Sequence, residues 1–164
     1  MKLSILIGSI FLMTACGSVM SDMEPLRGEV DSITVDAPGA KGDDLYIVSN
    51  SWCVDTFVSA ESVIEFQDKE AGMIKGKYVT DLIDGMYYVS VKTIITVQVK
   101  NEKARMILSD PMMRITGDSL NGIYASAKSY TPISSTSVYG KMKPEWQDLL
   151  TSFENAIKTQ KGSW

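Results

Sequence analysis

The chain contains no histidine, and only two of its 164 residues are cysteine. Without histidine, the Ser-His and Cys-His arrangements of nucleophilic catalysis and every histidine-ligated metal site are excluded. Cys16 has a separate use, described below, so no internal disulfide can form. Cys53 follows Trp52 in an amphipathic segment and is interpreted as a small buried hydrophobic residue rather than a reactive thiol.

The other residue types that commonly bind cofactors or metals also form no recognisable motif in this sequence. The glycines at 72 and 76, with Lys77, have the wrong spacing for a phosphate-binding loop, and Tyr78 stands where that loop needs Ser or Thr. The methionines lack the repeated spacing of a soft-metal site and are interpreted as gap-filling residues. We therefore expect neither a cofactor nor a metal.

Basic residues are in the minority. The sixteen Lys and Arg against twenty Asp and Glu give a net charge of −4 and a pI near 4.8. The first fifteen residues contain one basic and no acidic residue, so the chain without them has a net charge of −5. Because nucleic-acid binding requires a basic footprint, we expect no nucleic-acid partner.

The only long apolar run is at the N-terminus. Lys2 precedes ten mainly apolar residues, 3–12, a run too short to span a membrane permanently and typical of a secretory signal. The sequence LMTAC that closes it resembles the lipobox of bacterial lipoproteins, which places lipid attachment at Cys16. The alternative is an ordinary signal peptide with a cysteine at its cleavage point.

This N-terminus predicts a location. Residues 1–15 are expected to be removed as a signal peptide, and acyl chains such as palmitate on Cys16 would hold the protein on a membrane. The expected site is the periplasmic side of a bacterial outer membrane, with surface display left open. Residues 16–28 are small, polar and marked by Pro and Gly, which predicts a tether before a single domain over 29–161.

The domain begins with a strand and a helix. Val30, Ile33 and Val35 alternate with polar residues, which indicates a half-buried strand. A helix is expected from about Gly42 to Ser59, with Asp43 or Asp44 as its cap. Its apolar stripe is formed by Leu45, Val48, Trp52 and Thr56, flanked by Cys53 and Phe57.

Four strands follow. They are expected over 63–66, 73–80, 87–100 and 104–108, the first two around a charged turn and the last two around Asn101-Glu102. The strand from Tyr87 to Lys100 alternates over its whole length, which indicates an antiparallel sheet with one packed face.

The last part of the chain divides in two. Residues 116–143 are rich in Ser, Thr, Gly and Tyr without sustained period, which predicts a long functional or loose connection. A final helix is expected to begin at Pro144 and to stop at Gly162. The resulting order is β-α-β-β-β-β-α, and two helices with apolar stripes covering one sheet face predict a two-layer α+β domain.

The segments SNSWCVDTF and SVIEFQDKEAGMIKGKYV also resemble a family of exported bacterial proteins of unknown function with a TBP-like fold. The resemblance extends over about 33–157 and is sharpest over 51–79. The matching positions are Trp52, Phe57, Val63, Ile64, Asp68, Lys69, Gly72, Ile74, Gly76 and Lys77. It implies a fold and a compartment but no activity, and similarity to the fold of the TATA-box-binding protein does not carry DNA binding with it.

The alternation along the strands also predicts which side chains point away from the packed face of the sheet. Basic and aromatic residues are expected to gather on the open face of the sheet, edged by Tyr124, Tyr130 and Tyr139: Lys75, Lys77, Tyr88, Lys92, Lys100, Lys103 and Arg105. Such a local field can concentrate an anionic or sugar-bearing envelope component, or a protein partner, on an acidic domain. The plainer interpretation is a solvated face whose lysines prevent edge-to-edge pairing.

An enzyme is the alternative class. An envelope hydrolase would need two facing carboxylates, for which Asp81 with Asp84, or Asp68 with Glu70, are the candidates. Both pairs lie in turn-like segments, where acidic side chains are ordinarily solvated. A non-enzymatic binding module is therefore favoured.

Overall fold

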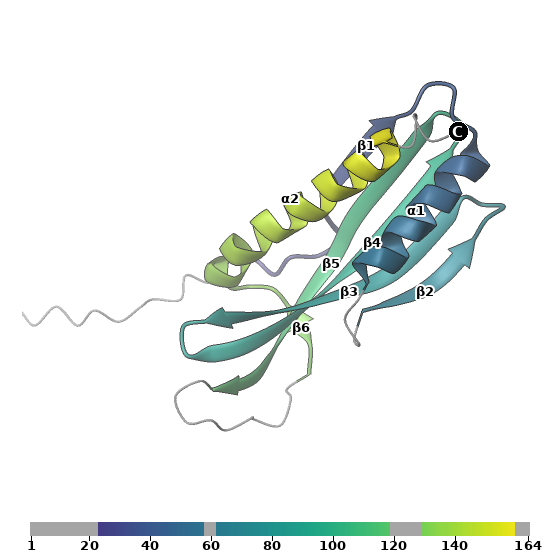
Figure 1. The fold of residues 1–164 in the computed structure, drawn as a ribbon. Coiled ribbons are helices and arrows are strands. Elements are labelled where there is room, and N and C mark those ends of the chain that lie inside the picture. Colours follow the sequence, from purple (N-terminus) through teal and green to yellow (C-terminus); the bar gives the residue numbers. More distant parts are fainter. Residues whose placement is uncertain (1–22, 58–61, 119–128, 160–164) are drawn as a thin grey trace, which may run out of the picture.

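The computed structural model describes residues 23–57, 62–118 and 129–159, which form one sheet and two helices (Figure 1). In chain order the elements are β1 (Glu29–Asp36), α1 (Gly42–Thr56), β2 (Val63–Asp68), β3 (Met73–Asp84), β4 (Tyr87–Lys100), β5 (Lys103–Asp118), β6 (Thr131–Pro132) and α2 (Thr136–Thr159). All pairings are antiparallel, in the order β1-β5-β4-β3-β2, with β6 beside β5. The predicted two-layer α+β architecture is confirmed.

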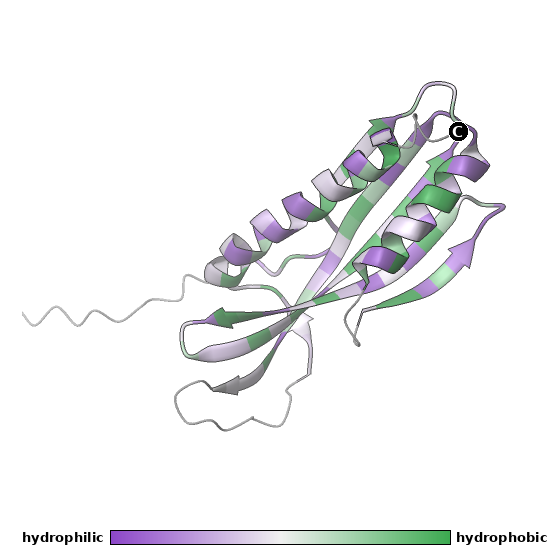
Figure 2. Ribbon diagram, viewed as in Figure 1, coloured by the Kyte–Doolittle hydropathy of each residue, from purple (hydrophilic) through white to green (hydrophobic). Residues whose placement is uncertain are grey.

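The core lies between the sheet and the two helices. Alternate residues of β4 and β5, such as Val91 and Met106, are fully buried because their side chains point toward the helices. The same alternation shows as green and purple bands along these strands in Figure 2. The remaining inward-facing residues of these two strands include Val89, Thr93, Ile95, Val97, Ala104 and Leu108.

Tryptophan side chains fix α2 to the sheet and α1 to α2. The Trp146 indole N–H of α2 donates to the Thr93 hydroxyl at 3.1 Å, so this buried threonine of β4 is satisfied. Trp52 of α1 packs edge-on against Phe153 at 5.3 Å between ring centroids and donates to the Ser152 hydroxyl at 3.0 Å. These contacts hold α1 and α2 side by side.

The helix predicted from Gly42 is confirmed, but its capping differs. Lys41 is the N-cap and makes no side-chain cap bond, so the prediction of Asp43 or Asp44 as cap is wrong. Instead, the Asn101 side chain in the β4–β5 turn accepts the Gly42 N–H at 2.8 Å. The two aspartates lie in the first turn, where they complement the helix dipole. The helix ends at Thr56, and Ser59 lies outside the described residues.

Cys53 is on the covered side of α1 and is 1% exposed. Burial raises the pKa of its thiol to about 12. The thiol therefore stays protonated near neutral pH, and the interpretation of Cys53 as a buried hydrophobic residue is confirmed.

The final helix begins eight residues before Pro144, so the predicted start is wrong. Val138 and Met142 extend the buried stripe toward the N-terminus, and the Ser135 hydroxyl accepts the Val138 N–H at 3.3 Å. Pro144 lies inside the helix on its exposed side, where the carbonyl group that loses its proline donor, that of Gly140, can bond water. The irregular segment predicted over 116–143 is correspondingly shorter.

The fifth strand is also longer than predicted, because it continues past Leu108 through a bulge. The register of β4 and β5 shifts between Lys92 and Ile94, and Asp110 adopts a φ of 47°. Asp110 and Gly28 stabilise this bulge: the Gly28 N–H donates to the Asp110 carboxylate, and the Asp110 N–H donates to the Gly28 carbonyl, each at 2.8 Å. Pro111 follows at the bulge, where no ladder donor is needed.

The first described residues, which precede β1, are hydrogen-bonded to the domain. The Met23 N–H donates to the Ser134 carbonyl at 2.8 Å, and the Leu26 N–H donates to the Ile133 carbonyl at 2.9 Å. The tether predicted over 16–28 is therefore shorter on its domain side. Cys16 and the signal-like residues 1–15 lie outside the described residues.

Candidate functional site: the uncovered face of the sheet

The seven residues predicted for the open face all lie on the side of the sheet opposite the helices. Their strand neighbours Ile74, Val91 and Ala104 are buried under the helices, so alternation directs the predicted residues outward. Cross-strand register supports this placement, because Lys103 pairs with Lys100 in the β4–β5 ladder. The predicted residues extend over the whole length of the sheet and do not form a single cluster.

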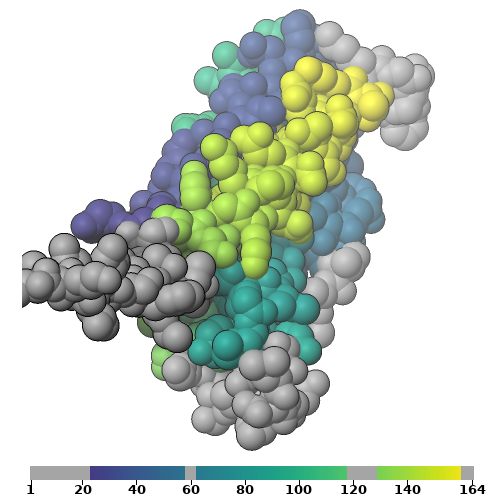
Figure 3. Space-filling view, turned by 90° about the vertical axis from the view of Figure 1, so that its left-hand side faces the viewer, coloured from purple at the N-terminus to yellow at the C-terminus, as the bar shows by residue number. Residues whose placement is uncertain are grey.

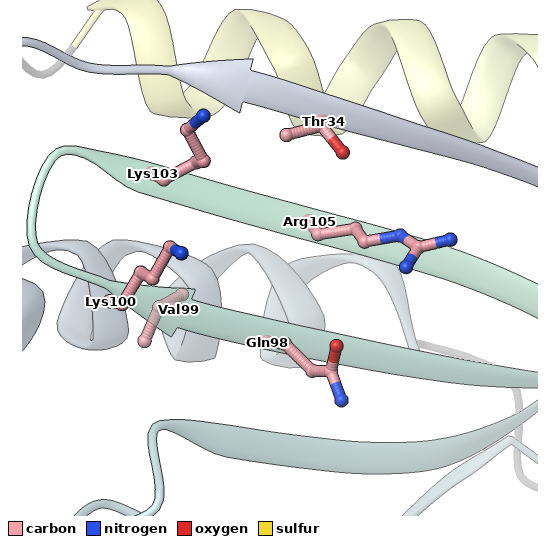
Figure 4. Close-up of a pocket in the computed structure, with 6 residues that line it drawn as sticks. All are labelled: Thr34, Gln98, Val99, Lys100, Lys103 and Arg105. Carbon is pink, nitrogen blue, oxygen red and sulfur yellow. The ribbon is translucent and has the colours of Figure 1, made fainter.

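Three of them meet at the end of the sheet near the β4–β5 turn. Figure 4 shows Lys100, Lys103 and Arg105 on the side of the strands away from the helices. Together with three residues of β1 and β4 they line an open depression of about 300 Å³. The other lining residues are Thr34, Gln98 and Val99. No other predicted basic residue lines this depression.

Acidic residues of the edge strands partly neutralise this face. Lys103 pairs with Asp36 of β1 at 3.1 Å, and Arg105 donates to both carboxylate oxygens of Glu29 at 3.0 and 3.1 Å. A hydrogen bond from Ser32, followed by the charge of Arg105, lowers the pKa of Glu29. Among the described residues, Lys100 has no salt bridge. The depression therefore contains two paired cations and one unpaired cation.

A second basic group lies further along the same face. The Tyr130 ring lies 4.8 Å from the Lys92 ammonium and 4.7 Å from the Arg114 guanidinium, and its hydroxyl contacts Ser90 at 3.2 Å. The prediction that Tyr130 edges the open face is therefore confirmed. Arg114 was missed because the sequence pattern gave no reason to continue the strand beyond Leu108.

The other two tyrosines predicted at the edge behave differently. Tyr139 is in α2, and its ring packs against Trp146 at 6.1 Å on the covered side, so its prediction is wrong. The cause is the early start of α2, which places Tyr139 on a helix rather than in a loop. Tyr124 lies outside the described residues.

Neither of the two predicted carboxylate pairs forms a pair of facing acids. Asp84 points to α2, where Lys141 donates to it at 2.8 Å, whereas Asp81 lies on the open face opposite Ser90. Asp68 accepts the Ala71 N–H at 2.9 Å within its own turn, and Glu70 is exposed in that turn. Neither pair lines the depression on the open face. Within the described ranges, no helix is long and apolar enough to cross a membrane.

Fold and site together define a two-layer α+β domain. Within the described ranges, one face of its sheet is free of helices and partly basic. Residues 32–113 match the family described as "Domain of unknown function (DUF4468) with TBP-like fold", and the chain belongs to this family. The predicted resemblance to a family of unknown function with a TBP-like fold is confirmed.

Two solved structures share the fold. A TBP-like protein from Parabacteroides distasonis ATCC 8503 aligns with a TM-score of 0.54 and 13% identity over 76% of this chain and 92% of its own. A DUF4468 family protein from Bacteroides ovatus ATCC 8483 aligns with a TM-score of 0.53 and 15% identity over 82% and 86%. At these identities the likeness shows the fold alone. Comparison with curated protein sequences gave no match.

Proposed function

We propose that the protein is a lipid-anchored, non-enzymatic binding module of the bacterial cell envelope that holds an anionic glycan on the uncovered sheet face. The observation that carries this proposal is the convergence of Lys100, Lys103 and Arg105 around one depression. The lipid attachment at Cys16 and the outer-membrane location rest on the lipobox-like sequence.

The composition of the depression favours acidic groups over neutral sugars. Three cationic side chains are accompanied by the Gln98 amide and the Thr34 hydroxyl, which supply further polar contacts. No aromatic ring is among its six lining residues, so a neutral sugar would find no stacking surface there. Carboxylate and phosphate groups match the ammonium and guanidinium donors.

The existing ion pairs do not prevent such binding. The side chains of Lys103 and Asp36 are 47% and 71% exposed, and pairs this exposed contribute about 0–1 kcal/mol. An incoming anion can displace Asp36 from Lys103 at little cost, and within the described residues Lys100 needs no displacement. The bidentate pair of Arg105 and Glu29 is held more firmly. The negative charge of the whole chain would oppose non-specific association with anionic polymers.

Titration calorimetry with uronic-acid, phosphorylated and neutral oligosaccharides tests this proposal. The double variant Lys100→Ser/Lys103→Ser should lose binding of the acidic sugars by about tenfold or more, because two charge-assisted contacts are removed. Lys143→Ser/Lys158→Ser on α2 is the matched control, since it removes the same charge from the opposite layer and should retain binding. Equal affinities for the two variants, or tighter binding of the neutral sugars, would overturn the proposal.

A further inference from the structure

The turn between β3 and β4 has an exposed apolar tip. Ile83, Met86 and Tyr88 are 57%, 42% and 40% exposed, although each is a large hydrophobic side chain. Ile83 and Tyr88 are cross-strand partners and therefore lie side by side on the same face. Gly85, with a φ of +60°, allows the tight turn between the strands. These three side chains are defined here as the apolar tip.

The first turns of α2 hold this tip in place. Lys141 donates to the Ile83 carbonyl at 2.7 Å and to the Asp84 carboxylate at 2.8 Å, and Ser137 also donates to Asp84. The turn is therefore braced by the helix, and little conformational entropy remains to be lost when the tip contacts a partner.

The described chain begins at the same end of the molecule. Met23 is bonded to Ser134, three residues before the Ser137 that holds Asp84. Figures 1 and 3 show the end of β3 and the start of β4 next to the beginning of α2. Six residues lie between Cys16 and Met23, so the two Cα atoms are seven steps apart and at most about 25 Å from each other when this chain is extended. A lipid on Cys16 would keep this end of the domain close to the bilayer.

We infer that the apolar tip inserts into the membrane–water interface beside the lipid anchor. Aliphatic and tyrosine side chains are those that partition to this interface. The depression lies at the other end of β4, roughly 40 Å from the tip at ~3.3 Å per residue. Inserted in this way, the domain would direct its basic depression away from the membrane. The inference rests on the proposed lipid anchor but not on the proposed glycan.

Quenching by nitroxide-labelled lipids tests this insertion in the lipidated full chain on phosphatidylcholine vesicles. A fluorophore is attached to Met86→Cys at the tip or to Glu70→Cys in the exposed β2–β3 turn at the opposite end. Cys53 does not react because it is 1% exposed. Quenching should be several-fold stronger at position 86 than at position 70. Because the lipid is zwitterionic, attraction between net charges does not contribute to this difference.

Two further variants in the Met86→Cys background separate the tip from general hydrophobicity. Ile83→Ser/Tyr88→Ser should reduce the quenching at position 86 several-fold, because burying each of these two apolar side chains favours insertion by about tenfold. Ile47→Ser/Val54→Ser on α1 is the matched control: both residues are 58% exposed but lie away from the tip, and quenching should not change.

Flotation with the vesicles distinguishes the two failures. If the protein floats but positions 86 and 70 are quenched equally, the anchor stands and the insertion is overturned. If the lipidated chain does not float, the anchor proposal fails and the insertion fails with it. Equal loss of quenching in the tip and α1 variants would also overturn the insertion.

Discussion

The two faces of the sheet are built from the same strands but have opposite surroundings. On the covered face Val91, Met106 and Trp146 are 0–1% exposed, and even the hydroxyl of Thr93 has its partner. On the uncovered face, Lys100 of β4 and Arg105 of β5 line an open depression, and Phe66 of β2 is 47% exposed. The difference indicates that the covered face contributes most of the stability of the fold, whereas the side chains of the other face contribute little to it. Substitutions on each face can test this division.

Removing the Trp146 ring should have the greatest effect. Trp146→Ala leaves a cavity between α2 and β4 and an unpaired Thr93 hydroxyl, so we expect a loss of about 3–5 kcal/mol in the free energy of unfolding. Phe66→Ala on the uncovered face is the matched control and should cost less than about 1 kcal/mol. Urea denaturation measures both. Similar losses would show that the two faces contribute equally.

Adding a methyl group to the covered face should also destabilise the fold. A Cβ at Gly76 would lie 2.3 Å from Phe57 Cε2 and 3.0 Å from the Val63 carbonyl, so Gly76→Ala is expected to cost about 1–3 kcal/mol. Gly140→Ala, in contrast, meets nothing within 4 Å on the exposed side of α2 and should stabilise by about 1 kcal/mol. Thermal unfolding of the two variants should therefore shift in opposite directions. Shifts in the same direction would contradict the packing described here.

The Asp84 carboxylate gives the smallest effect and a pH dependence. Burial raises its pKa, but hydrogen bonds from Lys141 and Ser137 and the Lys141 charge outweigh burial and hold the pKa below the usual 3.8. This stabilisation is thus present above about pH 3.8 and is lost as the pH falls through the lower folded value. We expect Asp84→Asn to cost about 1 kcal/mol at pH 7 and progressively less below pH 4.

Denaturant unfolding between pH 2.5 and 7 measures this dependence. Asp81→Asn, on the uncovered face three residues earlier, changes the charge equally and should follow the wild-type curve. A pH-independent cost for Asp84→Asn would contradict the assigned contacts.

The sequence predicts those parts of the fold in which one period continues without interruption. The alternation from Tyr87 to Lys100 correctly places Lys92 and Lys100 on the uncovered face because a strand has a strict period of two. The family resemblance agrees with this architecture, since two of its matched positions, Gly72 and Gly76, are sites of close packing.

The errors occur where a local signal is overruled by distant contacts. Pro144 is a good first helical residue, but the burial of Val138 and Met142 against the sheet extends the helix upstream of it. The bulge at Asp110 depends on Gly28, 82 residues away, so no local pattern could have shown that β5 continues to Arg114. The depression likewise needs Thr34 of β1 beside β4 and β5, a neighbourhood set by strand order.

The attachment of Met23 and Leu26 to the residues before α2 has a mechanical consequence. A force applied through the chain ahead of Met23 reaches these two hydrogen bonds first and then the two bonds between Gly28 and Asp110. It reaches the β1–β5 ladder only after all four have broken. Once released, residues 23–28 can extend to a length of roughly 20 Å. The domain can therefore yield under shear at its attachment point while its sheet stays intact.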